Sequence, residues 1–421
     1  MGIVMSACGL DFGTSNSAIG IMRGNAPVLA PVEGDATIIP SAVFFDYENK
    51  GRVSFGSDAI KSIIEQRDGR LMRALKSILA SSLIDKKTAL GSRMVPLTEV
   101  VEIFVRHLKE KAEAFAGEEL TAVVHGRPVR FVDDDDVADA KAQRVLQDIA
   151  HKVGFRDVAF VYEPIAAARH YEEGATREET VLIADIGGGT SDFTVIRVGP
   201  ERRLRIDRAQ DILANAGTRI GGTDFDALFS LNTVMPILGL GTYLMTKNLP
   251  MPRSLYSELA NWPTINFTYT FQNERMLTEL VADACEPEKV ARLLKTIRQR
   301  LGHRIALAVE DAKIALSEAV SVGLHLDFLE TGLEALPDRK SLDSSIAEKT
   351  ERLHRTAAAC IADEGIKSAD IQTIFFTGGS GRIPKVRDAI MRAAPIARTT
   401  KGSDFLSVAL GLTREALKRF E

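Results

Sequence analysis

Two stretches of the chain share one layout: GLDFGTSNSAIGIMR at residues 9–23 and VLIADIGGGTSDFTVIRV at residues 181–198. In each, an apolar run leads to Asp-x-Gly, at Asp11 or Asp185, and a second run rich in apolar residues follows the turn. β-Branched and aromatic runs joined by a glycine-rich turn predict a β-hairpin. An apolar run that ends in Asp predicts a buried strand that delivers its carboxylate to a loop. The repeat therefore predicts two similar halves, each opening with such a hairpin.

Strands and helices alternate through the rest of the chain. Residues 99–115, 137–152 and 341–363 show helical spacing of apolar residues, and residues 288–318 predict one long helix or two in series. This alternation predicts an α/β fold with mainly parallel sheets and helices outside them. The other expected elements are strands at 121–126 and 158–163, a helix opening at 164–171, a strand, glycine loop and helix at 371–390, and a last helix at 405–419.

The repeat divides the chain into two expected lobes. Lobe I covers residues 1–178, with the last helix, 404–421, packing back on it. Lobe II covers residues 179–403 and includes an inserted or divergent subdomain at about 223–320.

Composition excludes several classes of protein. The chain has 421 residues, of which 45% are hydrophobic and 26% charged, as in soluble globular proteins. Its net charge of -4 argues against a nucleic-acid-binding surface. Cys8, Cys285 and Cys360 are widely spaced, so we expect buried thiols and neither a disulfide nor a zinc site. The apolar start predicts a strand rather than a signal peptide, and the uncharged residues 227–246 predict a buried, broken helix rather than a membrane span.

The glycine-rich turns predict a phosphate site. The chain contains neither GxxxxGK[ST] nor a GxGxxG that opens a helix, so the two familiar phosphate loops are missing. The hairpin glycines instead let backbone N–H groups converge on an anion, beside aspartates suited to hydrated Mg²⁺. A third turn, TGGSGR at residues 377–382, ends a strand before Pro384. The acidic run at residues 133–136 is a metal site or, as we prefer, the favourable start of a helix.

Seven motifs resemble, in order, the ATPase domain of the 70-kilodalton heat-shock chaperones, within the broader fold of actin, sugar kinases and heat-shock ATPases. The resemblance implies an actin-like ATPase fold with MgATP or MgADP in a cleft between the lobes. The motifs are LDFGTSNS (10–17), ALKSIL (74–79), VYEPIAAA (161–168), ADIGGGTSDF (184–193), IGGTDFD (220–226), EDAKIALS (310–317) and FTGGSGRIP (376–384).

The resemblance also implies roles for single residues. Asp11 and Asp185 would hold Mg²⁺, largely through its waters. The catalytic group would contain Lys76, which neutralises the γ-phosphate, and Glu163, Asp192 and Thr190, of which the two acids orient metal waters or the attacking water. The residues expected to bind the nucleotide are Gly13, Thr14, Ser15, Asn16, Gly187, Gly188, Gly189, Thr190, Gly221, Gly222, Glu310, Lys313, Ser317, Gly378, Gly379, Ser380 and Arg382.

Each of these residues also has a plain structural interpretation. Asp11 or Asp185 alone is compatible with a turn residue, and Lys76 with a solvated helix charge. Glu310, Lys313 and Ser317 fall on one face of a helix, as the polar stripe of an amphipathic helix also does. The joint pattern favours the site.

The chain departs from the family pattern in three places. Ile314 stands where the family has the first of two arginines that sandwich adenine, while Arg382 retains the second. Residues 231–300 resemble nothing identified, and they contain Trp262 and half of the tyrosines, which we expect to fill a core rather than an interface. We also expect no peptide-binding domain after the last helix, so the nucleotide cycle would act on a protein partner or client, through lobe II.

We therefore expect a cytoplasmic MgATP-binding ATPase whose slow hydrolysis is coupled to opening and closing of the lobes, with no nucleic-acid or membrane partner. One alternative is a metabolite kinase of the same fold. Another is a non-hydrolysing, nucleotide-dependent module that binds or assembles.

Overall fold

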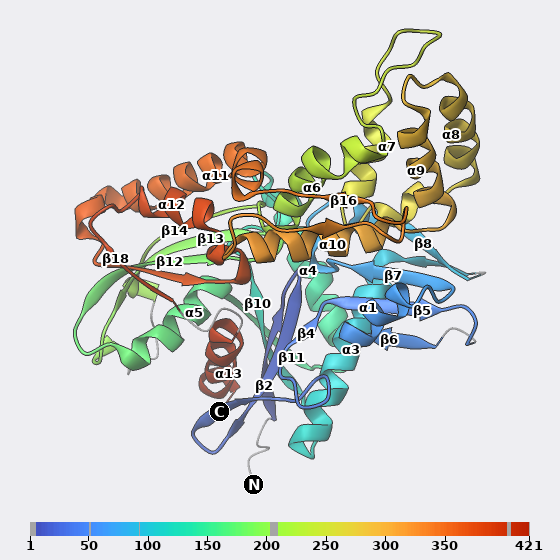
Figure 1. The fold of residues 1–421 in the computed structure, drawn as a ribbon. Coiled ribbons are helices and arrows are strands. Elements are labelled where there is room, and N and C mark those ends of the chain that lie inside the picture. Colours follow the sequence, from blue (N-terminus) through green and yellow to red (C-terminus); the bar gives the residue numbers. More distant parts are fainter. Residues whose placement is uncertain (1–5, 50–51, 92, 203–208, 402–405, 421) are drawn as a thin grey trace.

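The two predicted hairpins lie in two β-sheets of a computed structural model that describes residues 6–49, 52–91, 93–202, 209–401 and 406–420 (Figure 1). β1 (Ala7–Phe12) pairs antiparallel with β2 (Asn16–Arg23), and β12 (Glu179–Ile186) pairs antiparallel with β13 (Ser191–Val198). Both hairpins are thus confirmed. In each sheet the first hairpin strand also pairs in parallel with a later strand: β1 with β10 (Ala122–Arg127) and β12 with β17 (Thr373–Thr377).

The two sheets are mixed, so the prediction of mainly parallel sheets was wrong. The six-stranded sheet has the order β11-β10-β1-β2-β3, with β4 beside β2, and the five-stranded sheet has the order β14-β13-β12-β17-β18. A short turn can join only antiparallel neighbours, so the hairpins force antiparallel pairing on one side of each sheet. The outer strands are β3 (Ala26–Leu29), β4 (Ile39–Pro40), β11 (Asp157–Tyr162), β14 (Ile212–Thr218) and β18 (Arg398–Lys401).

The predicted helices are present. The region 288–318 forms two helices, α9 (Pro287–Arg298) and α10 (Gly302–Leu316), because the chain turns at Arg300, whose φ of 53° is left-handed. The acidic run is a helix start, as preferred, since the Asp135 carboxylate accepts the N–H of Ala138 at 2.9 Å. The other large helices are α3 (Leu97–Ala116), α4 (Asp136–Lys152), α5 (Glu163–Tyr171), α6 (Gly222–Thr233), α11 (Arg339–Ala362), α12 (Pro384–Met391) and α13 (Ser407–Phe420).

Helices α5 and α13 pack against each other between the two main sheets (Figure 1). α13 contacts β1, β2 and β10, and α5 contacts β12 and β13. A Cβ at Gly411 of α13 would lie 2.0 Å from the carbonyl oxygen of Ala166 of α5, so the crossing requires glycine. Arg169 and Glu415 form an ion pair of 2.7 Å across the same crossing.

A small sheet and a hairpin flank the six-stranded sheet. The small sheet has the order β6-β5-β7 and carries helix α1. The bounds are β5 (Ala42–Asp46), β6 (Val53–Phe55), α1 (Gly56–Ile64), β7 (Gly69–Arg73), α2 (Lys76–Leu79), β8 (Lys87–Leu90) and β9 (Arg93–Pro96). A further pair of short strands, β15 (Leu324–His325) and β16 (Glu334–Ala335), is antiparallel.

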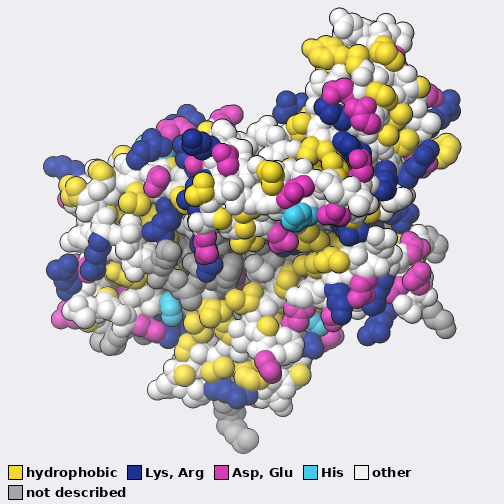
Figure 2. Space-filling view, in the orientation of Figure 1, with side chains coloured by type: hydrophobic (Ala, Val, Ile, Leu, Met, Phe, Trp, Pro, Cys, Tyr) yellow, Lys and Arg dark blue, Asp and Glu magenta, His cyan; other side chains and the backbone are white. Residues whose placement is uncertain are grey.

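Helices α7 (Arg253–Ala260), α8 (Phe271–Asp283) and α9 form an arm that projects from the rest of the chain (Figure 1). Trp262 and Tyr256 are buried, which confirms the expectation that they fill a core. Tyr243 is 50% exposed, so the same expectation was wrong for it. On the face shown in Figure 2, acidic and basic side chains are interspersed with hydrophobic ones over this arm.

The uncharged region 227–246 is a broken helix, as predicted: α6 is followed by a short 3-10 turn, Met235–Leu238. None of the described helices combines the length and apolar character that a membrane span requires. Cys8 and Cys360 are buried free thiols, but Cys285 is exposed, so burial was wrongly expected for it. Cys285 directly precedes Glu286, the N-cap residue of α9.

Candidate functional site

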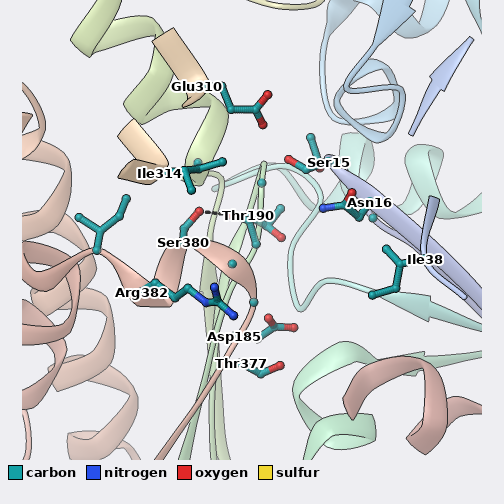
Figure 3. A pocket seen from close by; sticks show the side chains of 18 of the residues that line it. Ser15, Asn16, Ile38, Asp185, Thr190, Glu310, Ile314, Thr377, Ser380 and Arg382 are labelled. Atoms are coloured by element: carbon teal, nitrogen blue, oxygen red, sulfur yellow. Dashed lines mark hydrogen bonds between the residues drawn. The ribbon is translucent and has the colours of Figure 1, made fainter. Parts of the chain in front are cut away.

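The turns of the two hairpins face one cavity, whose volume is about 390 Å³ (Figure 3). The β1–β2 turn and the β12–β13 turn supply its floor, and α10 and the turn after β17 supply one wall. In Figure 3, Ser15 and Asn16 lie across the cavity from Ile314 and Ser380.

The two turns are in direct contact. A Cβ at Gly188 would lie 2.2 Å from the hydroxyl oxygen of Ser15, and one at Gly189 would lie 2.6 Å from that of Thr14. Only glycine leaves room for this approach. Each turn is also fixed from behind: Ser41 donates to the carbonyl of Gly13 at 2.8 Å, and Thr223 donates its N–H to that of Gly188 at 2.7 Å.

A cluster of charged groups lies beneath the turns. Lys76, at the start of α2, is 4% exposed and forms an ion pair with Glu163, which begins α5. Asp11 and Asp185 each lie one residue before the end of the first strand of a hairpin and line the same cavity. The backbone before Lys76 is held in a left-handed conformation at Ala74, with φ 56°.

The cluster holds more negative than positive charge. Burial, together with the nearby Glu163 carboxylate, raises the pKa of Asp11 and of Asp185 well above the usual value. Burial opposes the charge of Lys76, but Glu163 and Asp11 outweigh it and raise the pKa of this ammonium group. A cation bound among these carboxylates would relieve their mutual repulsion.

Asp192 lies behind Thr190 and does not line the cavity. It is 1% exposed, and its carboxylate accepts the N–H of Val129 at 2.6 Å and the hydroxyl of Thr190. Burial, and secondly Glu163, raise the pKa of Asp192 to about 7. Thr190 itself lines the cavity, so Asp192 reaches it through this hydroxyl.

The polar face of α10 lines the wall of the cavity, but its charges are already paired. Glu310 forms an ion pair with Arg73 of β7, whose guanidinium also lies over the Trp262 ring at 4.6 Å. Lys313 contacts Asp226 of α6 at 2.6 Å. Asp226 is buried, and burial raises its pKa to about 6 although Lys313 opposes the shift.

Most of the predicted site residues meet in this one cavity. Gly189, Asp192 and Gly221 do not line it; a Cβ at Gly221 would lie 2.5 Å from the backbone of Gly188, so this residue supports the turn from outside. The predicted residues that line the cavity are Asp11, Gly13, Thr14, Ser15, Asn16, Lys76, Glu163, Asp185, Gly187, Gly188, Thr190, Gly222, Glu310, Lys313, Ser317, Gly378, Gly379, Ser380 and Arg382.

Sequence reasoning missed several lining residues. Ile38 and Val408 belong to no motif, and no local signal distinguishes them from ordinary core residues. Ile314 lines the cavity and is 57% exposed, on the same side as Arg382 (Figure 3).

The donor set fits magnesium held mainly through water. Among the described residues, no three His, Cys, Asp or Glu side chains come close enough to hold a metal ion together. Mg²⁺ retains several waters in proteins and is bound by one or two carboxylates with substrate phosphates, which Asp11 and Asp185 can provide beside the turns.

Comparison with known families agrees with this geometry. A family model described as Hsp70 protein matches residues 80–234 and 275–401. The match resumes at residue 275, so the expectation that residues 231–300 resemble nothing was wrong outside residues 235–274, while the motifs at 10–17 and 74–79 precede the matched part. The mixed α/β architecture is consistent with the actin-like ATPase fold of that family. Since the two matched ranges cover more than half of the chain, this protein belongs to the Hsp70 family.

Proposed function

We propose that the chain binds MgATP in the cavity between the hairpin turns and hydrolyses it to ADP and phosphate, with opening and closing of lobes I and II. The observation that supports this most directly is the contact of Gly188 with Ser15 above the Lys76–Glu163 pair. It brings two sets of backbone N–H groups and one ammonium group to the same cavity, and phosphates need such donors.

Different residues would have different roles in phosphoryl transfer. The turns at residues 13–16 and 187–190 would donate backbone N–H groups to the β- and γ-phosphates. Lys76, held by Glu163, would neutralise charge on the γ-phosphate. Asp192 would orient the Thr190 hydroxyl, which in turn would orient the attacking water. Mg²⁺ held by Asp11 and Asp185 would neutralise further charge on the phosphates.

Two further parts of the proposal come from the family. Heat-shock ATPases of this family act on proteins, so we propose that the output of the nucleotide cycle is a protein partner or client. We also propose that the protein acts in the cytoplasm.

The proposal predicts magnesium-dependent turnover of bound ATP. With Mg²⁺, radiolabelled ATP bound to the protein should be converted to ADP and free phosphate in a single turnover. With EDTA, binding should weaken and conversion should stop, because no cation then links Asp11 and Asp185 to the phosphates. Asp185→Asn should show the same loss with Mg²⁺ present. If bound ATP stays intact in every condition, the proposed hydrolysis is wrong and the chain is a nucleotide-binding module.

The Ile314→Arg variant should bind ATP more tightly. Ile314 lines the cavity on the side of Arg382, and a second guanidinium there can stack on the base, which contributes about 0.5–2 kcal/mol. Titration calorimetry should therefore show affinity rising by about 2- to 30-fold. Val137→Arg is the control, because Val137 of α4 is also an exposed hydrophobic residue and does not line the cavity. Unchanged ATP affinity in Ile314→Arg would contradict the stacking argument.

A further inference from the structure

A second cavity of about 430 Å³ lies away from the hairpin turns. One side comes from the segment that joins α1 to β7 and from the β8–β9 turn, and the other from residues 266–269 and from the junction of α9 with α10. Figure 1 shows β7 and β8 below this junction. The cavity thus joins two parts of the chain that are far apart in sequence.

The charges that line this cavity are mostly positive. Arg67, Arg70, Arg300 and Arg304 line it, and Asp68 supplies the acidic side chain among the lining residues. Asp68 contacts Arg300 at 3.4 Å, while Arg67 is paired at 2.7 Å with Glu65, which lies outside the lining.

Arg70 and Arg304 have no carboxylate within ion-pair distance among the described residues. Arg70 donates to the carbonyl of Ala89 at 3.2 Å, and its buried Nε has no hydrogen-bond partner. The guanidinium of Arg304 lies 4.4 Å from the centre of the Phe328 ring. Burial lowers the pKa of both arginines, and at Arg70 the side chain of Tyr47, which also lines the cavity, opposes this shift only in part.

The start of α10 also lines this cavity and adds a group that can donate to an anion. Its first turn contains no acidic residue, and the hydroxyl of Tyr269, which also lines the cavity, accepts the N–H of Gly302 at 3.0 Å. His303, in that turn, lines the cavity and is 1% exposed, and its Nε2 has no hydrogen-bond partner. Burial, and secondly Arg70 and Arg73, lower the pKa of His303 to about 3, so the ring is neutral. A neutral imidazole with its proton on Nε2 can donate to an anion.

We propose that the cavity between Arg70 and Arg304 binds a small anion that carries two or more phosphate groups. Guanidinium groups bind phosphate through two parallel N–H···O bonds, and a helix N-terminus favours negative charge. The cavity is larger than a single phosphate requires. Its volume of about 430 Å³ slightly exceeds the volume of about 390 Å³ of the cavity between the hairpin turns. Such an anion bridges residues 47–91 to residues 266–304, and it does so whether or not the protein hydrolyses ATP.

Binding of inorganic pyrophosphate, measured by titration calorimetry in metal-free, low-salt buffer, tests the proposal. Wild-type protein is expected to bind pyrophosphate, and orthophosphate at least about tenfold more weakly. Arg70→Gln and Arg304→Gln are each expected to lose at least about tenfold in pyrophosphate affinity, since each removes a charge-assisted pair. Arg300→Gln, at a side chain that is 53% exposed, should weaken binding without a risk to folding.

Two controls separate this site from the nucleotide cavity. Arg355→Gln removes an equal charge from an exposed position on α11 and should leave pyrophosphate binding unchanged. Lys76→Ala alters the nucleotide cavity and should retain the binding event that the arginine variants lose. Equal affinity in wild type and the three arginine variants would overturn the proposal, as would a loss confined to Lys76→Ala or the absence of pyrophosphate binding at millimolar concentration.

Discussion

Replacement of Lys76 by alanine is expected to slow hydrolysis of bound ATP by about 10²- to 10³-fold, the usual cost of removing one preorganised group that stabilises transition-state charge. Lys76 supplies the buried ammonium group among Asp11, Glu163, Asp185 and Asp192, as the described residues show. Without it, the γ-phosphate would lose the ammonium group that offsets these carboxylates. Single-turnover conversion of bound ATP, with Mg²⁺ and saturating protein, measures the effect.

Loss of stability has to be separated from loss of chemistry in this variant. Removing one partner of a buried ion pair costs about 3–5 kcal/mol, and Lys76→Ala leaves Glu163 unpaired. Lys109→Ala is the matched control: Lys109 is also buried, pairs with Glu113 on α3, and does not line the cavity. The double variant Lys76→Ala/Glu163→Gln removes both partners and should regain stability but not hydrolysis. Wild-type turnover in Lys76→Ala would refute its proposed role.

The hairpins and their meeting could be predicted from sequence because their signals are local. Asp-x-Gly after an apolar run defines a strand end, and the repeat of that pattern implies two equivalent ends that face one ligand. In the structure the two turns meet where Gly188 contacts Ser15. The mixed pairing of the sheets follows from the same hairpins, but the alternation of strands and helices concealed it.

The ion pairs around the site could not be predicted, because they join residues far apart in the chain. Arg73 and Glu310 come from β7 and α10, and Lys313 and Asp226 from α10 and α6. Motif reasoning assigned Glu310 and Lys313 to a ligand without any sign that each already has a buried partner. The depth of each residue was equally hidden: Thr190, just before β13, lines the cavity, whereas Asp192, two residues later, is buried and does not line it.

The Asp192→Asn variant should be more stable than wild type in the absence of nucleotide, and the gain should grow with pH. Burial raises the pKa of Asp192 to about 7 in the folded protein, against an ordinary value of 3.8. The folded state therefore binds this proton more tightly, so stability is highest below the unfolded pKa and is lost as pH rises through 7. Asparagine carries no such proton, and it retains an oxygen that can accept the N–H of Val129.

The expected difference in unfolding free energy between Asp192→Asn and wild type is larger at about pH 8 than at about pH 5, by about 2 kcal/mol, as urea titrations at both pH values would measure. Hydrolysis should move the other way and fall by about tenfold, because the Thr190 hydroxyl loses its charged acceptor. Asp46→Asn provides a control of opposite sign: hydrogen bonds from Asn49 and Glu48 lower the pKa of Asp46, so its loss should destabilise the protein at both pH values. An Asp192→Asn gain that is equal at both pH values would show that Asp192 does not have a raised pKa and is already ionised at about pH 5.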